Sequence, residues 1–337
     1  MLRIGPPFRQ TPDRPCDWAT ARVLFPAALW LLALLGAVLQ TGCTASSQPT
    51  TLSDLGRRVG VVEFEAALGQ PGPIGFERIV AADWVVDRSG LINLDHPEAK
   101  KQGIASGPEP IEIFLYVLTH PSRGTWLVDS GVAEVFREEG RAPQVSPIVN
   151  AVMATDNLDV HVSTAEWLAA QARPPAGVLL THIHMDHVMG LPDVPGSVPV
   201  FVGRGETRGR AFLNLFTRGT LDRLIARDEA LQEFDFVPPS GDEPRSILDV
   251  FGDGSLFAIH SPGHTPGSTA FVARTPDGPK LLVGDTCHTA WGWLNGVEPG
   301  SFTADHAANA ISLAWLRDLA AAHPELEVHL GHQRLPR

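Results

Sequence analysis

The segment from residue 178 to residue 187, VLLTHIHMDH, constrains the fold more than any other part of the chain. It begins as an apolar strand-like run and ends in four side chains of metal-binding type, His182, His184, Asp186 and His187. In an extended chain alternate side chains share a face, so His182, His184 and Asp186 would point one way and His187 the other. All four can converge only if the strand ends near Met185 and the chain bends. Such a bend favours two adjacent metal ions over one.

The residue types in this cluster indicate which metals it would bind. Four ionisable groups within six residues would be costly to bury without partners, which favours metal binding over a purely structural role. The chain has three cysteines, Cys16, Cys43 and Cys287, too few and too scattered for a disulfide framework or a cysteine zinc site. Imidazoles with carboxylates and no thiolate suit Zn²⁺, and they can also hold Fe or Mn.

The length and net charge of the chain limit the number of domains and the classes of partner that it can bind. With 337 residues, 44% of them apolar, the chain can bury a large core, and one domain of about 250 residues is reasonable for a layered β architecture. The formal net charge of −12 disfavours a polyanion as partner, because phosphate contacts need clusters of Lys and Arg. We therefore expect a small-molecule substrate and no nucleic acid.

The N-terminal region has the pattern of an export signal. Four arginines precede an apolar segment at residues 23–39, which is followed by Thr41, Gly42 and Cys43. This end resembles a bacterial lipobox, with Cys43 as the lipidated residue, although Gln40 stands where Leu is usual. The alternative is an uncleaved membrane anchor. Both interpretations remove residues 1–43 from the fold and predict an exported, membrane-attached protein in the periplasm or cell envelope.

The rest of the chain predicts a flexible tether at residues 44–59, rich in Ser, Thr and Gln, and one folded domain at residues 60–337. Alternating or continuous apolar runs predict strands, Gly and Pro predict loops, and Ser163 with Glu166 forms a capping box that begins a helix. We expect strands at residues 61–64, 76–86, 111–118, 125–128, 198–202, 247–251, 255–260, 269–273, 280–283 and 326–330, helices at 206–231 and 304–322, and a long loop at 87–110.

Four apolar runs end directly before a candidate ligand. These ligands are His182, His264, Asp285 and His332. In layered α/β folds, ligand sites lie at the carboxyl ends of strands, so we expect these four positions to meet at one edge. His260, His288 and His329 lack this context, and we interpret them as loop histidines or supports.

The combined motifs resemble the metallo-β-lactamase-fold hydrolases over residues 60–335. The motifs are LVDSG at 127–131, HxHxDH at 182–187, GHTPG at 263–267, GDT at 284–286 and Gly331-His332. The resemblance implies a single-domain αβ/βα four-layer sandwich with two metal ions. It places His182, His184 and His264 on one ion and Asp186, His187 and His332 on the other, with Asp285 as the bridge and Asp129 supporting a ligand imidazole from behind.

The resemblance also implies the chemistry. A hydroxide held between two ions would attack a lactone, an ester or a related small substrate, and Asp186 would be catalytic by relaying a proton to the leaving group. Lactonases of this family commonly polarise the carbonyl with a tyrosine, but the only tyrosine here is Tyr116, on an early strand. Four aromatic residues in predicted loops, Trp84, Trp291, Trp293 and Phe302, either wall the site with apolar surface or pack loops onto the core.

Three other functions remain open from the sequence. An iron-dependent oxidoreductase similar to the persulfide dioxygenases uses part of this ligand set. A hydrolase of β-lactams or phosphotriesters shares the fold, although the bridging position of Asp285 argues against β-lactams. A lipoprotein that holds metal without catalysis is the third.

Overall fold

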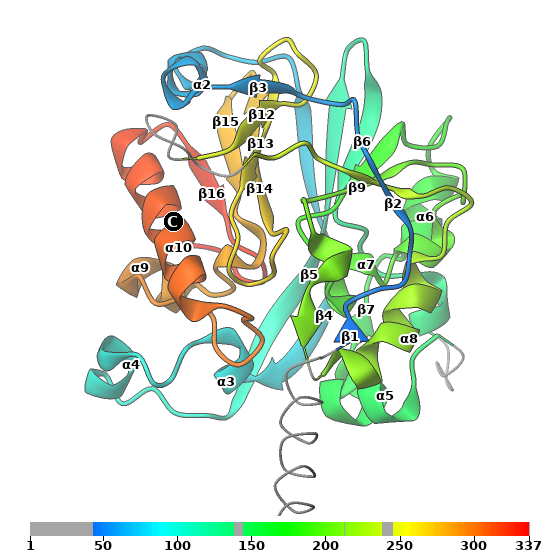
Figure 1. Cartoon of the computed structure of the whole chain (residues 1–337), viewed down its shortest axis with the longest axis vertical. Helices are drawn as coiled ribbons and strands as arrows, with labels where there is room; N and C mark the ends of the chain where they lie inside the picture. Colours follow the sequence, from blue (N-terminus) through cyan, green and yellow to red (C-terminus); the bar gives the residue numbers. More distant parts are fainter. Residues whose placement is uncertain (1–42, 138–143, 212, 238–244, 337) are drawn as a thin grey trace, which may run out of the picture. The chain divides into compact units, whose positions relative to one another are not determined.

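Two mixed β-sheets lie face to face at the centre of the molecule (Figure 1). The computed structural model describes residues 43–137, 144–211, 213–237 and 245–336, and residues 43–337 form one compact unit. The larger sheet has the strand order β2 (Thr50–Leu52), β11 (Leu231–Glu233), β9 (Val200–Val202), β8 (Gly177–Leu179), β6 (Gly124–Val128), β5 (Pro108–His120), β4 (Gly75–Asp87) and β7 (Asp159–Val160). The smaller has the order β16 (Glu327–His329), β15 (Gly278–Leu282), β14 (Thr269–Thr275), β13 (Leu256–His260), β12 (Ile247–Asp249) and β3 (Arg57–Val59).

Strand β5 shows how the sequence builds this arrangement. Its successive side chains point to opposite faces, so Phe114, Tyr116 and Leu118 pack between the sheets. Ile113, Leu115 and Val117 pack on the other face, towards the helices. A strand that is apolar at nearly every position therefore lies inside two cores at once.

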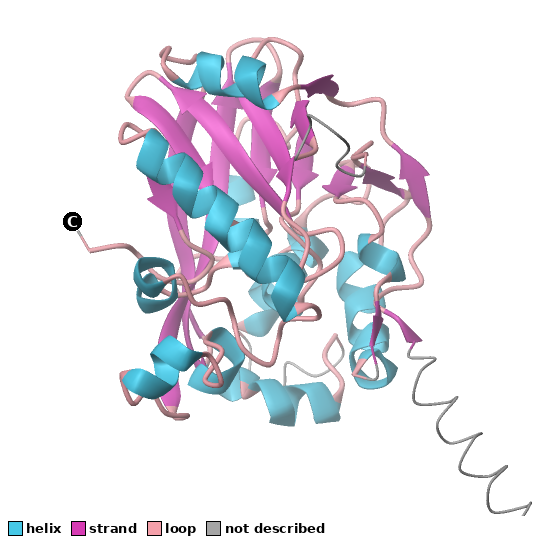
Figure 2. Ribbon diagram, turned by 60° about the vertical axis from the view of Figure 1, so that its left-hand side comes forward, coloured by secondary structure: helices cyan, strands magenta, loops and turns pink. Residues whose placement is uncertain are grey.

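Helices cover the outer face of each sheet (Figure 2). α2 (Val61–Leu68) and α10 (His306–Ala322) pack on the smaller sheet, and α5 (Pro147–Met153), α6 (Thr164–Ala169), α7 (Met185–Val188) and α8 (Asn214–Ile225) lie beside the larger one. The order helix, sheet, sheet, helix confirms the predicted four-layer sandwich. Among the residues with a described structure, no helix is long and apolar enough to cross a membrane.

The prediction for residues 44–59 does not match the structure. This segment contains β2, β3 and the second residue of β1 (Cys43–Thr44). β1 pairs with β10 (Arg210–Ala211), β2 with β11, and β3 with β12. Its polar residues suit short edge strands that are open to water, and partners about 165 to 190 positions away give no local signal. Of the signal predicted at residues 1–43, residues 1–42 lie outside the described residues.

Three further local predictions need correction. Residues 61–64 begin helix α2, because Phe64 and Leu68 are spaced one helical turn apart and are both buried. Of the helix predicted at 206–231, only α8 is α-helical, and residues 231–233 form β11. The loop predicted at 87–110 contains the short helices α3 (Arg88–Leu91) and α4 (Pro97–Lys101).

The remaining elements agree with the sequence within a few residues. The capping box of Ser163 and Glu166 is present at the start of α6, with both reciprocal hydrogen bonds formed. β12 and β13 form the predicted antiparallel hairpin around residues 252–254. Both signals are local in the sequence, which explains why they could be predicted.

Candidate metal centre

Loops that follow four strands carry the predicted ligands to one place. β8 ends at Leu179, earlier than the expected position near Met185, and the chain then runs through His182 and His184 into α7. Asp186 and His187 lie in the first turn of this helix, so the predicted bend is present. His264 follows β13, Asp285 follows β15, and His332 follows β16. All seven predicted ligand residues meet beyond the ends of these strands, as layered α/β folds favour.

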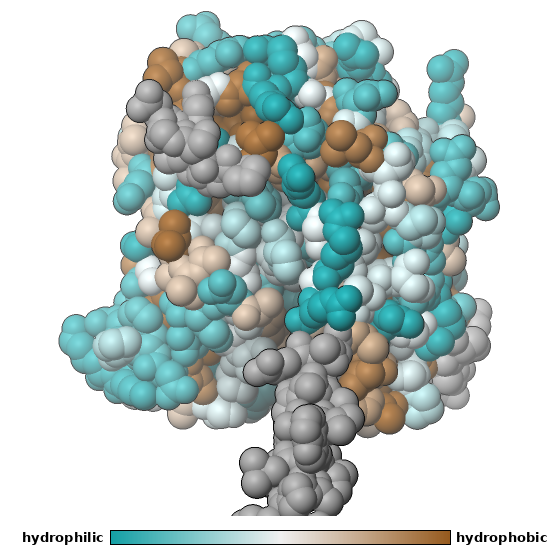
Figure 3. All heavy atoms as spheres, viewed as in Figure 1, coloured by the Kyte–Doolittle hydropathy of each residue, from teal (hydrophilic) through white to brown (hydrophobic). Residues whose placement is uncertain are grey.

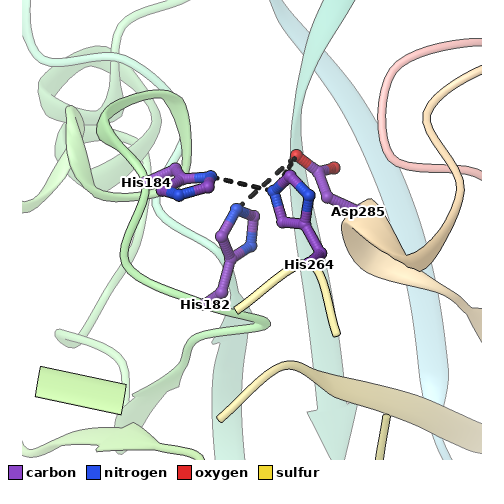
Figure 4. Close-up of side chains that lie close together, drawn as sticks. All are labelled: His182, His184, His264 and Asp285. Carbon is purple, nitrogen blue, oxygen red and sulfur yellow. Dashed lines mark hydrogen bonds and ion pairs between the residues drawn. The ribbon is translucent and has the colours of Figure 1, made fainter. Parts of the chain in front are cut away.

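The first group of ligands contains His182, His184, His264 and Asp285 (Figure 4). One donor atom from each residue lies within 4.8 Å of the others. The Nε2 atom of His264 is 2.8 Å from Nδ1 of His184 and 3.5 Å from Oδ2 of Asp285, and Nε2 of His182 is also 3.5 Å from that oxygen. The donors therefore converge on a space of the size of one ion.

The second group contains Asp186, His187, His332 and again Asp285. The Nε2 atom of His332 lies 3.1 Å from Oδ2 of Asp186 and 3.3 Å from Oδ2 of Asp285. The Nε2 atom of His187 lies 3.2 Å from the same Asp285 oxygen. Asp285 is the one residue shared by both groups, which is the position that a bridging carboxylate requires.

Two buried atoms at the centre lack partners that a protein normally supplies. Nε2 of His182 and Oδ1 of Asp285 have no hydrogen-bond partner among the described residues. An unpaired buried acceptor costs free energy, so these atoms fit ligands whose partner is a cation. The set of five imidazoles and two carboxylates suits zinc in number and type.

The imidazoles of the first group are held in the neutral form. Burial lowers the pKa of His184 to about 4 and lowers the pKa values of His182 and His264 well below the usual value. Neighbouring imidazoles lower the pKa values of His182 and His264 further. A neutral imidazole is the form that binds a metal ion, so this group is ready to accept one.

The imidazoles of the second group have raised pKa values, in contrast to those of the first group. Burial alone would lower the pKa of His332, but Asp285 and Asp186 raise it to about 10. Burial also opposes the charged form of His187, yet Asp285, Asp129 and Asp186 together raise its pKa well above the usual value. Protons therefore occupy this half when no ion is bound, and an ion must displace them.

Asp129 supports the second group from behind, in the arrangement expected for it. It follows β6 in a left-handed backbone conformation, with φ of 56°, which non-glycine residues rarely adopt. This turn directs its carboxylate to Nδ1 of His187 at 2.8 Å, while the backbone N–H of Thr181 donates to its other oxygen at 2.8 Å. The contact fixes the ring of His187 so that Nε2 faces the ligand space.

Glu206 supports the first group, a role that the sequence did not predict. It is the first residue of the helix predicted at residues 206–231, and its side chain is buried, with 1% exposure. One carboxylate oxygen accepts from the backbone N–H of Ile183, between His182 and His184. The other accepts from the hydroxyl of Thr265 and the N–H of Gly267, next to His264. Glu206 thus ties together the two loops that carry the first group.

His288 supports the shared carboxylate, which is one of the two roles expected for it. Its ring is buried, and its Nε2 lies 2.9 Å from Oδ2 of Asp285, closer than any of the four ligand histidines that contact this oxygen. The ring stacks on His332, with centroids 5.4 Å apart, and meets His264 edge-on. The spacing Asp285-x-x-His288 is the sequence signal for this contact, and the sequence left both a loop role and a supporting role open for His288.

The predicted aromatic wall is only partly present. Trp84 lies in β4, not in a loop, and it is buried, as is Trp293, which packs with α10 and the smaller sheet. Trp291 and Phe302 remain partly exposed. Tyr116 is buried between the sheets and lines a small cavity with Asp129, His187 and His332, behind the ligands.

Comparison with known proteins agrees with this geometry. N-acyl homoserine lactonase AttM of Azorhizobium caulinodans is 30% identical over 214 residues, which cover 63% of this chain and 77% of the relative. AttM of Agrobacterium fabrum is 29% identical over 229 residues, covering 66% and 81%.

Solved structures share the fold at low sequence identity. A crystal structure of AiiA from B. thuringiensis, with N-decanoyl-L-homoserine bound at its active site, aligns with a TM-score of 0.55 and 16% identity, covering 78% of this chain and 94% of that one. A probable metal-dependent hydrolase from Staphylococcus aureus aligns with a TM-score of 0.57 and 14% identity, covering 78% and 90%. The family model described as the metallo-beta-lactamase superfamily matches residues 108–332, so the chain belongs to this superfamily and is a metal-dependent hydrolase.

Proposed function

We propose that this hydrolase opens lactones, with N-acyl homoserine lactones or close relatives as substrates. The observation that carries the proposal is the complete set of seven ligands in two groups that share Asp285. The similarity to relatives named as N-acyl homoserine lactonases supports the substrate class.

We propose two Zn²⁺ ions as the resident metals, one in each group of donors. Bound in this way, two ions supply Lewis acidity towards a carbonyl oxygen and make water a nucleophile at neutral pH. The protein's part is to hold the donors in place, and Asp285 does so for both groups. Fe or Mn would fit the same donors less selectively.

Asp186 is the ligand best placed to handle a proton as well. Its side chain is 13% exposed, whereas those of His187, Asp285 and His332 are at most 5% exposed. One oxygen faces His332, and the carboxylate lies on the more open side of the second group. We propose that Asp186 takes a proton from the attacking water and passes it to the leaving alkoxide when the acyl C–O bond of the lactone breaks.

Tyr116 is buried behind the ligands, so it does not make the carbonyl contact that a tyrosine commonly makes in the resembling lactonases. His288 is buried as well, and both of its ring nitrogens are engaged: Nε2 lies 2.9 Å from Oδ2 of Asp285, and Nδ1 lies 3.3 Å from the carbonyl oxygen of Leu91. We propose that His288 holds the shared carboxylate in place. We expect H288F to weaken zinc binding and to lower kcat by about 10- to 100-fold, as for other residues that support metal ligands.

A substrate screen combined with metal analysis tests the proposed function. The full chain is assayed with lactones, aryl esters, phosphotriesters and β-lactams, and its metal content is measured in the same samples. We expect hydrolysis of lactones above the other classes, with two zinc ions per chain. Absence of turnover on every lactone and ester would overturn the proposal, and oxygen uptake on a persulfide with bound iron would replace it.

A further inference from the structure

We propose that the face formed by the first turns of α5 and α8 docks on a phospholipid bilayer that contains anionic headgroups. The inference concerns how the domain is oriented, and it does not depend on lactone hydrolysis. Three large apolar side chains on this face are exposed: Ile148 by 57%, Leu213 by 62% and Leu215 by 55%. Figure 3 shows hydrophobic side chains on the surface over α5 and α8. Exposed apolar side chains that cluster on one face indicate a surface with a partner.

The position of Cys43, where the described chain begins, favours a lipid bilayer as the partner of this face. Cys43 pairs with Ala211 in the β1–β10 ladder, and the side-chain amide of Asn214 donates to the carbonyl of Cys43 at 2.9 Å. The first residue of β1 is therefore fixed beside the first turn of α8, which carries Leu213 and Leu215 on either side of Asn214. The apolar segment at residues 23–39 precedes Cys43 by only a few positions.

Cys43 is held close to the domain because the residues that follow it are paired in sheets and do not form a free linker. Residues 44–59 were predicted to be a tether, yet β1, β2 and β3 within them are paired in sheets. If the chain is held in a bilayer by an anchor before Cys43, or by lipid on Cys43 itself, the domain begins at the membrane surface. The apolar turn of α8 is then the first part of the domain to meet lipid.

Charge on the same helix favours an anionic surface. α8 contains Arg218 and Arg223 and one acidic residue, Asp222. The carboxylate of Asp222 accepts from the hydroxyls of Ser46 and Ser47, at 2.6 and 2.5 Å, and lies 3.9 Å from Nε of Arg218, so α8 keeps a net charge of one positive unit. Basic side chains next to an apolar patch are attracted to anionic headgroups, although the whole chain carries a formal charge of −12.

A tryptophan placed on this face reports contact with lipid. We would reconstitute the full chain in vesicles of phosphatidylcholine and phosphatidylglycerol with brominated acyl chains, and compare L215W with I311W. Ile311 lies on α10 and is 61% exposed, which matches Leu215 in size and exposure. Subtraction of the wild-type signal removes the eight native tryptophans. Unchanged far-ultraviolet circular dichroism and an unchanged thermal unfolding midpoint show that each variant is folded.

We expect bromine to quench the added fluorescence of L215W at least about twofold more than that of I311W, since an interfacial helix buries its apolar face in the acyl boundary. Equal quenching at the two positions, no quenching at either, or failure of the chain to sediment with vesicles would each overturn the proposal. Vesicles of phosphatidylcholine alone should quench L215W less. Unchanged quenching there would overturn the part assigned to Arg218 and Arg223.

Discussion

The two halves of the metal centre contain similar donor atoms in different electrical surroundings. In the first half, His182, His184 and His264 are buried beside one another, and their pKa values are lowered. In the second half, His187 and His332 lie among Asp129, Asp186 and Asp285, and their pKa values are raised. Without ions, protons balance the charge of the second half, whereas the first half holds neutral rings and unpaired atoms. A metal ion would therefore bind to neutral imidazoles in the first half, and it would have to displace protons in the second half.

Removal of the shared ligand should have the largest effect, because it damages both halves. We expect D285A to bind less than one zinc ion per chain and to lose more than about 100-fold in lactone turnover, since even supporting residues of metal sites are worth 10- to 100-fold. Metal analysis after dialysis and a steady-state assay measure both quantities. If D285A kept two ions and full activity, Asp285 would not be the bridge.

Removal of one terminal ligand should separate the halves. We expect H264A and H332A each to retain about one zinc ion and to lose about 100-fold or more in turnover, because each removes one donor from a single group. Substitution of cobalt for zinc and its absorption spectrum identify which half is lost. Loss of both ions in both variants would show that neither half binds zinc without the other.

Removal of a supporting carboxylate should lower zinc affinity less than removal of a ligand, and only in the half that the carboxylate supports. We expect E206A to weaken zinc binding in the first half and D129A to weaken it in the second, each by about 10- to 100-fold. E206Q is a partial control: its amide oxygen can still accept a hydrogen bond from Ile183, whereas its NH2 group cannot accept from Gly267, so we expect an intermediate loss of zinc affinity. Identical metal affinities in E206A and wild type would show that Glu206 has no part in placing the ligands.

The number of protons released on zinc binding should differ between the two halves of the metal centre. At pH 7, His332 with a pKa of about 10 is protonated, whereas His184 with a pKa of about 4 is already neutral. In a weakly buffered solution we expect H264A, which keeps the second half, to release about one to two protons per zinc ion, and H332A to release fewer. Equal release from the two variants would contradict the assigned difference.

The same protons predict how the stability of the metal-free protein depends on pH. A raised pKa in the folded state means that His332 stabilises the fold fully below its usual pKa near 6.5, and that this contribution is lost as the pH rises through about 10. Denaturant unfolding of metal-free protein between pH 6 and pH 11 measures this loss. Zinc-loaded protein is the control, because the ion has already replaced the proton.

Substitution of Tyr116 should have the smallest effect. Its ring packs with Phe76, Phe114 and His329 between the sheets, away from the exposed side of the ligands. We expect Y116F to change lactone turnover by less than about threefold, because the substitution removes only one hydroxyl and keeps the volume. A loss of turnover as large as that expected for D285A would show that the hydroxyl of Tyr116 takes part in catalysis.

The sequence predicted the parts of this centre that depend on local pattern. Apolar runs followed by a ligand located β8, β13, β15 and β16, and the ends of these strands met as expected. The supports were harder to predict, because Glu206 contacts residues 183, 265 and 267 only after the two sheets pack together. The edge strands of residues 44–59 were missed for the same reason, since their partners are distant in the chain.

A zinc titration of the metal-free full chain tests the central claim most directly. Hydrolysis of an N-acyl homoserine lactone is followed as zinc is added in steps up to several equivalents per chain. We expect activity to rise and to saturate at two zinc ions, because the donors form two groups that share Asp285. Full activity at one ion, or no lactone hydrolysis at any zinc level, would contradict a dinuclear lactonase.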